Sequence, residues 1–158
     1  MIHVIGTNIS NEQAQAHFEA AKAYLIQSDL AEFLINQLDA IPEVLTINVS
    51  KSTDTTHPNT WGEVDGTAGT INWNVLRVLK TRSSACEMSP PLLLMHEMGH
   101  ACQYMSGQKG EMLEGLTLER RNLLENIDVS AIENTVANEL REKGCPEGVR
   151  ENYDDAQL

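Results

Sequence analysis

The sequence predicts an α+β fold in which helices pack beside a small twisted sheet. Apolar residues recur every three or four positions in residues 10–27 and 28–41, as on the buried face of a helix. The period changes to two in residues 44–50 and again in 70–75, where apolar and polar side chains alternate as in a half-buried strand. A chain of 158 residues can bury a substantial core, so we expect one domain over residues 1–158.

The N-terminal segments carry clear start and stop signals. Residues 1–5 alternate weakly and predict a short strand before a glycine. Ser10 followed by Gln13 forms a capping box, which predicts the start of the first helix. A second helix is expected to begin near Ser28 and to end at Pro42, because proline lacks the backbone N–H that the helix ladder needs.

Two connections flank the strand predicted at residues 70–75. Residues 51–66 are polar and predict a loop, in which His57 is expected to be solvated. Residues 76–89 form a connection of mixed character that holds the basic cluster upstream of the central helix. We expect this cluster to be a solvated face that could also help to bind a substrate. Its members are Arg77, Lys80 and Arg82.

The central helix is predicted over residues 89–107, where Ser89 is a candidate N-cap and Gly107 a candidate stop. It contains the pattern HExxH. His96 and His100 are four positions apart, so on a helix both imidazoles project from one face and can reach a single tetrahedral metal ion.

Glu97 lies next to the first histidine of this pattern, close enough to hold a metal-bound water and to accept its proton. A Zn²⁺ ion lowers the pKa of such a water toward about 7, which makes it a nucleophile at neutral pH. Glu97 can then pass the proton to the leaving amine. HExxH on a helix is the arrangement of zinc metalloproteases, and it predicts a zinc-dependent peptide hydrolase.

Two helices are expected after the central one. The first runs from Met112 to about Ile127, and residues 128–130 interrupt it. Ser130 followed by Glu133 predicts a capping box at the start of the last helix, which ends at Gly144-Cys145-Pro146.

A catalytic zinc usually has three protein ligands and an open position. No histidine follows His100, so we expect a carboxylate from a later helix as the third ligand. Glu119 is favoured because nineteen residues leave room for the helix to end, turn and run back; Glu133 is the second choice, although it has a capping role. Cys86 is a weaker candidate, as a thiolate ligand. The candidate carboxylates are Glu111, Glu114, Glu119, Glu125, Asp128 and Glu133.

Composition narrows the choice of partners. The formal charge of −12 argues against nucleic acid and against an anionic membrane surface, since both need basic patches. Three cysteines without CxxC spacing indicate reduced thiols. No apolar run is long enough to span a bilayer, and no cleavable signal peptide is evident.

Three segments resemble the bacterial effector metallopeptidases, zinc-dependent toxins delivered by type III secretion or carried as C-terminal domains of Rhs-type toxins. The segments are residues 70–74, residues 94–101, and Ile132-Glu133-Asn134 followed by Gly144, Pro146, Arg150 and Tyr153. The middle segment is a general zincin motif, and the last is the more specific.

The resemblance extends to the clostridial neurotoxin proteases, in which a later glutamate completes the zinc sphere and an RxxY pair stabilises the tetrahedral intermediate. It implies that Arg150 and Tyr153 are oxyanion stabilisers. The sequence departs from the family at Glu119, because Arg120-Arg121 follows where a Glu-Glu pair is usual. This removes one expected supporting carboxylate and bears on the choice of the third ligand.

Together these observations predict a zincin-like zinc endopeptidase that is secreted or translocated into a target cell and cleaves a protein there. His96, His100 and Glu119 are expected to bind Zn²⁺, Glu97 to be the general base, and Arg150 and Tyr153 to assist. We expect a monomer, with a cognate immunity protein or a secretion chaperone as further partners.

Two alternatives stay open. The first is a non-catalytic module that binds a host protein and retains a structural zinc on a zincin scaffold. The second is a zinc hydrolase of small molecules, which predicts a deep closed pocket instead of an open cleft beside residues 70–75.

Overall fold

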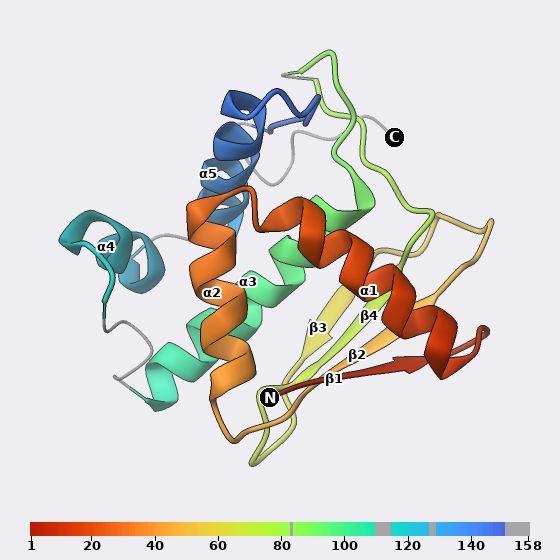
Figure 1. Ribbon diagram of the computed structural model, residues 1–158, viewed down its shortest axis with the longest axis horizontal. Helices are drawn as coiled ribbons and strands as arrows, with labels where there is room; N and C mark the ends of the chain where they lie inside the picture. Colours follow the sequence, from red (N-terminus) through yellow and green to blue (C-terminus); the bar gives the residue numbers. More distant parts are fainter. Residues whose placement is uncertain (83, 110–114, 127–128, 151–158) are drawn as a thin grey trace.

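The computed structural model describes residues 1–82, 84–109, 115–126 and 129–150. Over these residues the fold is α+β, with a four-stranded mixed sheet and five helices (Figure 1). The elements in chain order are β1 (Ile2–Gly6), α1 (Asn11–Leu25), α2 (Asp29–Ala40), β2 (Leu45–Ser50), β3 (Thr60–Gly62), β4 (Thr70–Asn74), α3 (Pro90–Gln108), α4 (Leu118–Asn126) and α5 (Val129–Glu142).

The sheet has the strand order β1-β2-β4-β3, with β1, β2 and β4 parallel and β3 antiparallel at one edge. Val4, Ile47 and Ile71 are register partners and all are buried, so they mark one core-facing side of the sheet. On the opposite side Asn48 donates a hydrogen bond to Asn72 at the surface. One face of the sheet therefore carries the core, as the predicted alternation requires.

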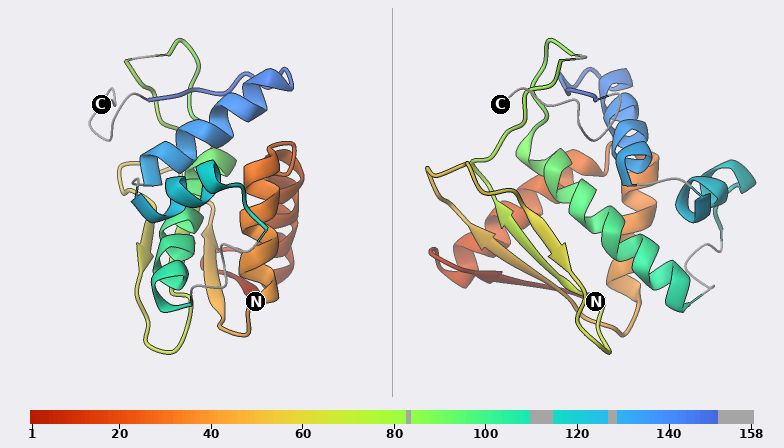
Figure 2. Two further views of the ribbon diagram at one scale, coloured as in Figure 1. Left: turned by 90° about the vertical axis from the view of Figure 1, so that its left-hand side faces the viewer. Right: turned by 180° about the vertical axis from the view of Figure 1, so that it is seen from behind.

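Helix α3 runs through the middle of the molecule, with α2 and α5 beside it (Figures 1 and 2). It contacts β3 and β4, while α1 packs on β1 and β2. Gly99 explains how closely α3 and α5 approach: a Cβ atom at this position would lie 3.0 Å from Cγ1 of Val129 at the start of α5. A helix interior glycine is costly in itself, so this contact accounts for its presence.

Most predicted elements are confirmed. The Ser10–Gln13 capping box is present, and Ser28 caps α2. None of the described helices is long and apolar enough to cross a membrane.

Three details differ from the sequence-based expectation. A short strand, β3, lies inside the predicted loop 51–66, because three residues are too few to show an alternating pattern. Helix α4 begins at Leu118 and not near Met112. The predicted capping box of Ser130 and Glu133 is wrong, because α5 already begins at Val129 and Ser130 lies within the helix. The side chain of Glu133 instead contacts His96 of α3.

Candidate active site

The start of α3 is fixed by a buried carboxylate from the C-terminal segment. Ser89 caps the helix by accepting from the backbone N–H of Leu92. Glu147 in turn accepts from the backbone N–H and the hydroxyl of Ser89 at 2.8 and 2.7 Å. Tyr24 of α1 donates to the same carboxylate at 2.5 Å. Since Glu147 is fully buried, it ties α1, α3 and the C-terminal segment to one another.

The two histidines of HExxH lie one turn apart on α3, as predicted. Their ring centroids are 5.2 Å apart and the rings are nearly perpendicular. His96 is buried, whereas His100 is partly exposed. Burial, and secondarily the charge of His96, lowers the pKa of His100, which favours the neutral form of this imidazole. A neutral imidazole is the form that can bind a metal ion.

A carboxylate from α5 lies against the first histidine. Oε2 of Glu133 is 2.8 Å from Nδ1 of His96, and Glu133 is completely buried. A carboxylate at this distance favours the tautomer with the proton on Nδ1, which leaves the lone pair of the ring on Nε2. The contact therefore leaves Nε2 as the nitrogen of His96 that could bind a metal ion.

Arg150 completes this buried cluster. Its Nε donates to Oε1 of Glu133 at 2.8 Å and its Nη2 donates to Oε2 at 2.9 Å. Nη2 also lies 3.3 Å from Nδ1 of His96. Asn134, the residue after Glu133, donates to the backbone carbonyl of Arg150 and accepts from its N–H. Adjacent residues of α5 thus bind the side chain and the main chain of Arg150.

Glu97, which follows His96 in the motif, is also buried. Burial raises the pKa of its carboxyl from 4.5 to about 7; His96 and Arg150 oppose the shift and the charge of Glu133 adds to it. A carboxyl with this pKa can both accept and release a proton near neutral pH. Glu97 lines a pocket of about 70 Å³ together with His96, Arg150 and residues of two loops. The other lining residues are Pro58, Asn59, Arg77, Leu79 and Leu93.

The family model Peptidase_M91, described as "Effector protein", matches residues 8–146. This span is most of the chain and includes all of α3 and α5. The chain belongs to the Peptidase_M91 family. Neither the curated proteins nor the solved structures gave a match.

Membership of the Peptidase_M91 effector family supports a peptidase that acts as an effector, as the resemblance implied. The matched span ends four residues before Arg150. In the structure Arg150 is nevertheless joined to the matched part through Glu133 and Asn134.

Glu119, the favoured third ligand, is not brought to the two histidines of this Peptidase_M91 protein. It is exposed on α4, which lies at the outer edge of the molecule (Figure 1). There it lines a different pocket with residues of α4 and with Thr135 of α5. Glu125 is also exposed on α4. Three further candidates, Glu111, Glu114 and Asp128, and the proposed oxyanion residue Tyr153 lie outside the described residues.

The donor set suits a metal ion in its chemistry. The structure brings together two imidazoles of one helix face, and a carboxylate fixes the tautomer of the first one. Within the described ranges no group of three or more histidine, cysteine, aspartate or glutamate side chains is arranged around one ion position. Among the described residues, His96 and His100 are thus the two side chains of this helix face that could hold a metal ion.

Sequence reasoning missed the aromatic residue beside the second histidine. The Trp61 ring of β3 stacks on His100, with centroids 6.1 Å apart and an interplanar angle of 19°. Its indole N–H donates to the carbonyl of Ala68, and Gly69 leaves room for the ring. An isolated tryptophan in an otherwise polar segment was the signal. His57, in the same segment, is exposed as expected and lies 3.4 Å from Asp54.

Proposed function

We propose that this protein is a zinc-dependent endopeptidase that acts as an effector inside a target cell. The observation that carries the proposal is the buried contact between Glu133 and His96 on an HExxH helix, beside a glutamate whose pKa lies near 7. Membership of an effector peptidase family supports the reaction class and the role. Zinc dependence, the site residues and delivery into the target cell are part of the proposal.

His96 and His100 would hold the zinc ion. A zinc ion bound there supplies Lewis acidity, which activates water at neutral pH and polarises a peptide carbonyl. Glu97 accepts the proton of the attacking water and gives it to the nitrogen of the leaving amine, so the peptide C–N bond breaks with no net change in the protons held by the enzyme.

Glu133 and Glu119 differ in how they could act on a bound metal ion. Glu133 touches Nδ1 of His96, and both of its oxygens accept hydrogen bonds from Arg150. We assign Glu133 the role of positioning His96, as carboxylates behind zinc-bound histidines commonly do. Glu119 would have to leave its exposed place on α4 to act as the third ligand. The zinc content of Glu119→Gln and Glu133→Gln proteins separates these roles.

Arg150 provides a fixed positive charge at the edge of the pocket. Because Glu133 and Asn134 hold it from two sides, its guanidinium is oriented before the substrate arrives. It would stabilise the negative charge that develops on the scissile carbonyl oxygen. The resemblance assigns Tyr153 the same task.

The dimensions of the pocket favour a polypeptide substrate. Sites that enclose a small molecule typically measure about 300–1,000 Å³, whereas the pocket beside His96 and Glu97 measures about 70 Å³. A chain that lies across the surface needs only a small depression for the atoms of one peptide bond. With a net charge of −12, the protein would favour a neutral or cationic substrate region.

Two measurements test the proposal. Elemental analysis of protein purified without chelators should give about one zinc per chain. Expression of the parent and of Glu97→Gln in target cells should show that only the parent cleaves a cellular protein. If the variant keeps both its zinc and its cellular effect, the protein acts by binding a host protein and the peptidase proposal fails.

A further inference from the structure

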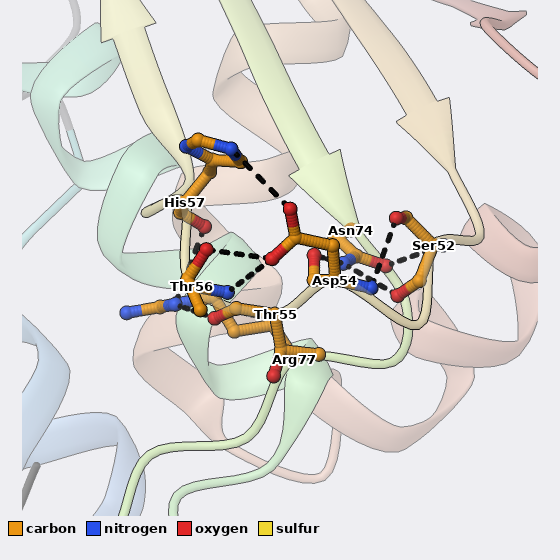
Figure 3. A network of polar contacts seen from close by, with 7 residues as sticks. All are labelled: Ser52, Asp54, Thr55, Thr56, His57, Asn74 and Arg77. Carbon is orange, nitrogen blue, oxygen red and sulfur yellow. Dashed lines mark hydrogen bonds and ion pairs between the residues drawn. The ribbon is translucent and has the colours of Figure 1, made fainter.

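The loop before β3 is held against the sheet by a network of polar contacts (Figure 3). Asn74, the last residue of β4, accepts from the backbone N–H of Ser52 at 3.1 Å and donates to the carbonyl of Ser52 at 3.0 Å. Asp54 accepts from the backbone and the hydroxyl of Thr56. The loop conformation is therefore specified by side chains, although it has no regular secondary structure.

Arg77 holds residues 55–57 of this loop in place through hydrogen bonds to their main chain. Its guanidinium donates to the backbone carbonyls of Thr55 and His57, as Figure 3 shows. Arg77 also lines the pocket that contains Glu97. The loop residues that follow, Pro58 and Asn59, line the same pocket. The network thus holds a loop that forms the wall of the pocket facing the HExxH helix.

One end of the Asn59 side-chain amide has a hydrogen-bond partner, and the other end has none among the described residues. Its Oδ1 accepts from the backbone N–H of Asn74 at 2.9 Å. This contact fixes which end of the amide is oxygen, because a backbone N–H requires an acceptor. Its Nδ2 is buried, and among the described residues it has no hydrogen-bond partner. Leaving such a donor unpaired is costly, so a ligand that binds it would recover free energy.

We propose that the side-chain amide of Asn59 binds a main-chain carbonyl oxygen of the peptide substrate next to the scissile bond. This inference rests on the proposed peptidase function. A neutral N–H donor matches a carbonyl oxygen, and a polypeptide presents such an oxygen at every residue. Asn59 directly precedes β3 at the edge of the sheet and lines the pocket that holds Glu97, which is where a bound peptide would lie. Asn59 is thus a substrate-binding residue.

The test compares two hydroxamates on zinc-loaded protein. Acetohydroxamate can reach only the metal, whereas acetyl-alanyl-alanine hydroxamate adds main-chain carbonyls. Asn59→Asp keeps the acceptor for the Asn74 N–H and removes the donor, and Asn59→Ala removes the side chain without adding a charge. Asn48→Asp is the matched control, because Asn48 pairs with Asn72 on the exposed face of the sheet.

We expect both Asn59 variants to bind the longer hydroxamate about threefold to tenfold more weakly, with unchanged affinity for acetohydroxamate and unchanged zinc content. The Asn48→Asp protein should behave as the parent. Equal affinity of parent and Asn59→Asp for the longer ligand, or an equal loss for both ligands, would overturn the inference.

A second readout keeps the inference separate from the zinc proposal. If the parent takes up no zinc, the proposed function fails, and acetyl-alanyl-alanine amide is titrated into ¹⁵N-labelled metal-free protein. A shift of the Asn59 side-chain amide resonances would still support a peptide-binding donor at this position. No shift at millimolar peptide would refute it.

Discussion

Arg150 and Glu133 form a buried, two-bond ion pair directly behind the first histidine of the HExxH helix. Arg150 is 6% exposed and Glu133 is fully buried, so neither charge is compensated by bulk water. The pair joins the C-terminal segment to α5 and orients His96 at the same time. This relationship gives Glu133 and Arg150 a structural role, to which the proposed function adds a chemical one.

Replacing Glu133 by glutamine should weaken both fold and metal binding. It leaves the Arg150 guanidinium buried without a counter-charge, which typically costs about 3–5 kcal/mol of unfolding free energy. Zinc affinity should fall roughly 10- to 100-fold, as is usual when the group that orients a metal ligand is lost. Urea unfolding of the metal-free protein and competition with a zinc chelator measure the two effects.

Glu119→Gln is the control for this experiment, because Glu119 is exposed on α4. This substitution should change the free energy of unfolding by no more than about 0.5 kcal/mol, and it should leave the zinc affinity unchanged. Loss of zinc from Glu119→Gln, with full zinc in Glu133→Gln, would instead identify Glu119 as the third ligand.

Glu97→Gln should slow proteolysis strongly while retaining zinc. The variant keeps the size of the side chain but cannot accept a proton, so the cleavage rate should fall by about 10²–10⁴. The measurement is the rate at which the cleaved cellular protein disappears, with zinc content determined on the same samples. A variant with parental cleavage would show that Glu97 is not the base.

The stability of the metal-free protein should depend on pH through Glu97. Its pKa in the folded state, about 7, lies above its ordinary value of 4.5 because burial disfavours the charged form. A group with a raised folded pKa contributes stability at low pH that is lost as the pH rises through that pKa. Glu97→Gln removes this pH dependence. Its effect on the free energy of unfolding of the metal-free protein should therefore be more stabilising at pH 8 than at pH 5, by roughly 1–3 kcal/mol.

Urea unfolding in the presence of a chelator at the two pH values checks this expectation. Glu125→Gln, at an exposed position of α4, should show the same small effect at both. An equal effect of Glu97→Gln at pH 5 and pH 8 would contradict the proposed ionisation.

The contact between α3 and α5 predicts that Gly99→Ala destabilises the protein, although alanine is normally the better residue inside a helix. Gly99→Ala gains about 0.5–1 kcal/mol of helix propensity, but its Cβ would lie 3.0 Å from Val129 Cγ1. We expect a net destabilisation of about 1 kcal/mol in the parent, because α5 must move away. Combined with Val129→Ala the same substitution should stabilise. Thermal unfolding of the parent, the two single variants and the double variant measures the coupling free energy between the two positions. Additive effects would show that α3 and α5 move apart without a free-energy cost.

The sequence by itself determined most of the elements and the placement of the HExxH side chains on one helix. HExxH on a helix depends on local spacing alone, so His96, Glu97 and His100 could be assigned from it. The alternation in residues 44–50 likewise predicted β2 and its buried face, and Ser10 with Gln13 predicted the start of α1. These are contacts between residues close in sequence, or preferences of single side chains.

Only the tertiary structure decided which distant groups meet at that centre. Glu133 fits a capping box by its spacing from Ser130, yet the helix begins at Val129 and the carboxylate contacts His96. Glu119 has a suitable separation from His100, but α4 holds it at the surface. Asn59, Trp61 and Glu147 acquire their partners through packing between elements far apart in the chain. Such partners depend on where helices and loops cross, which local patterns do not specify.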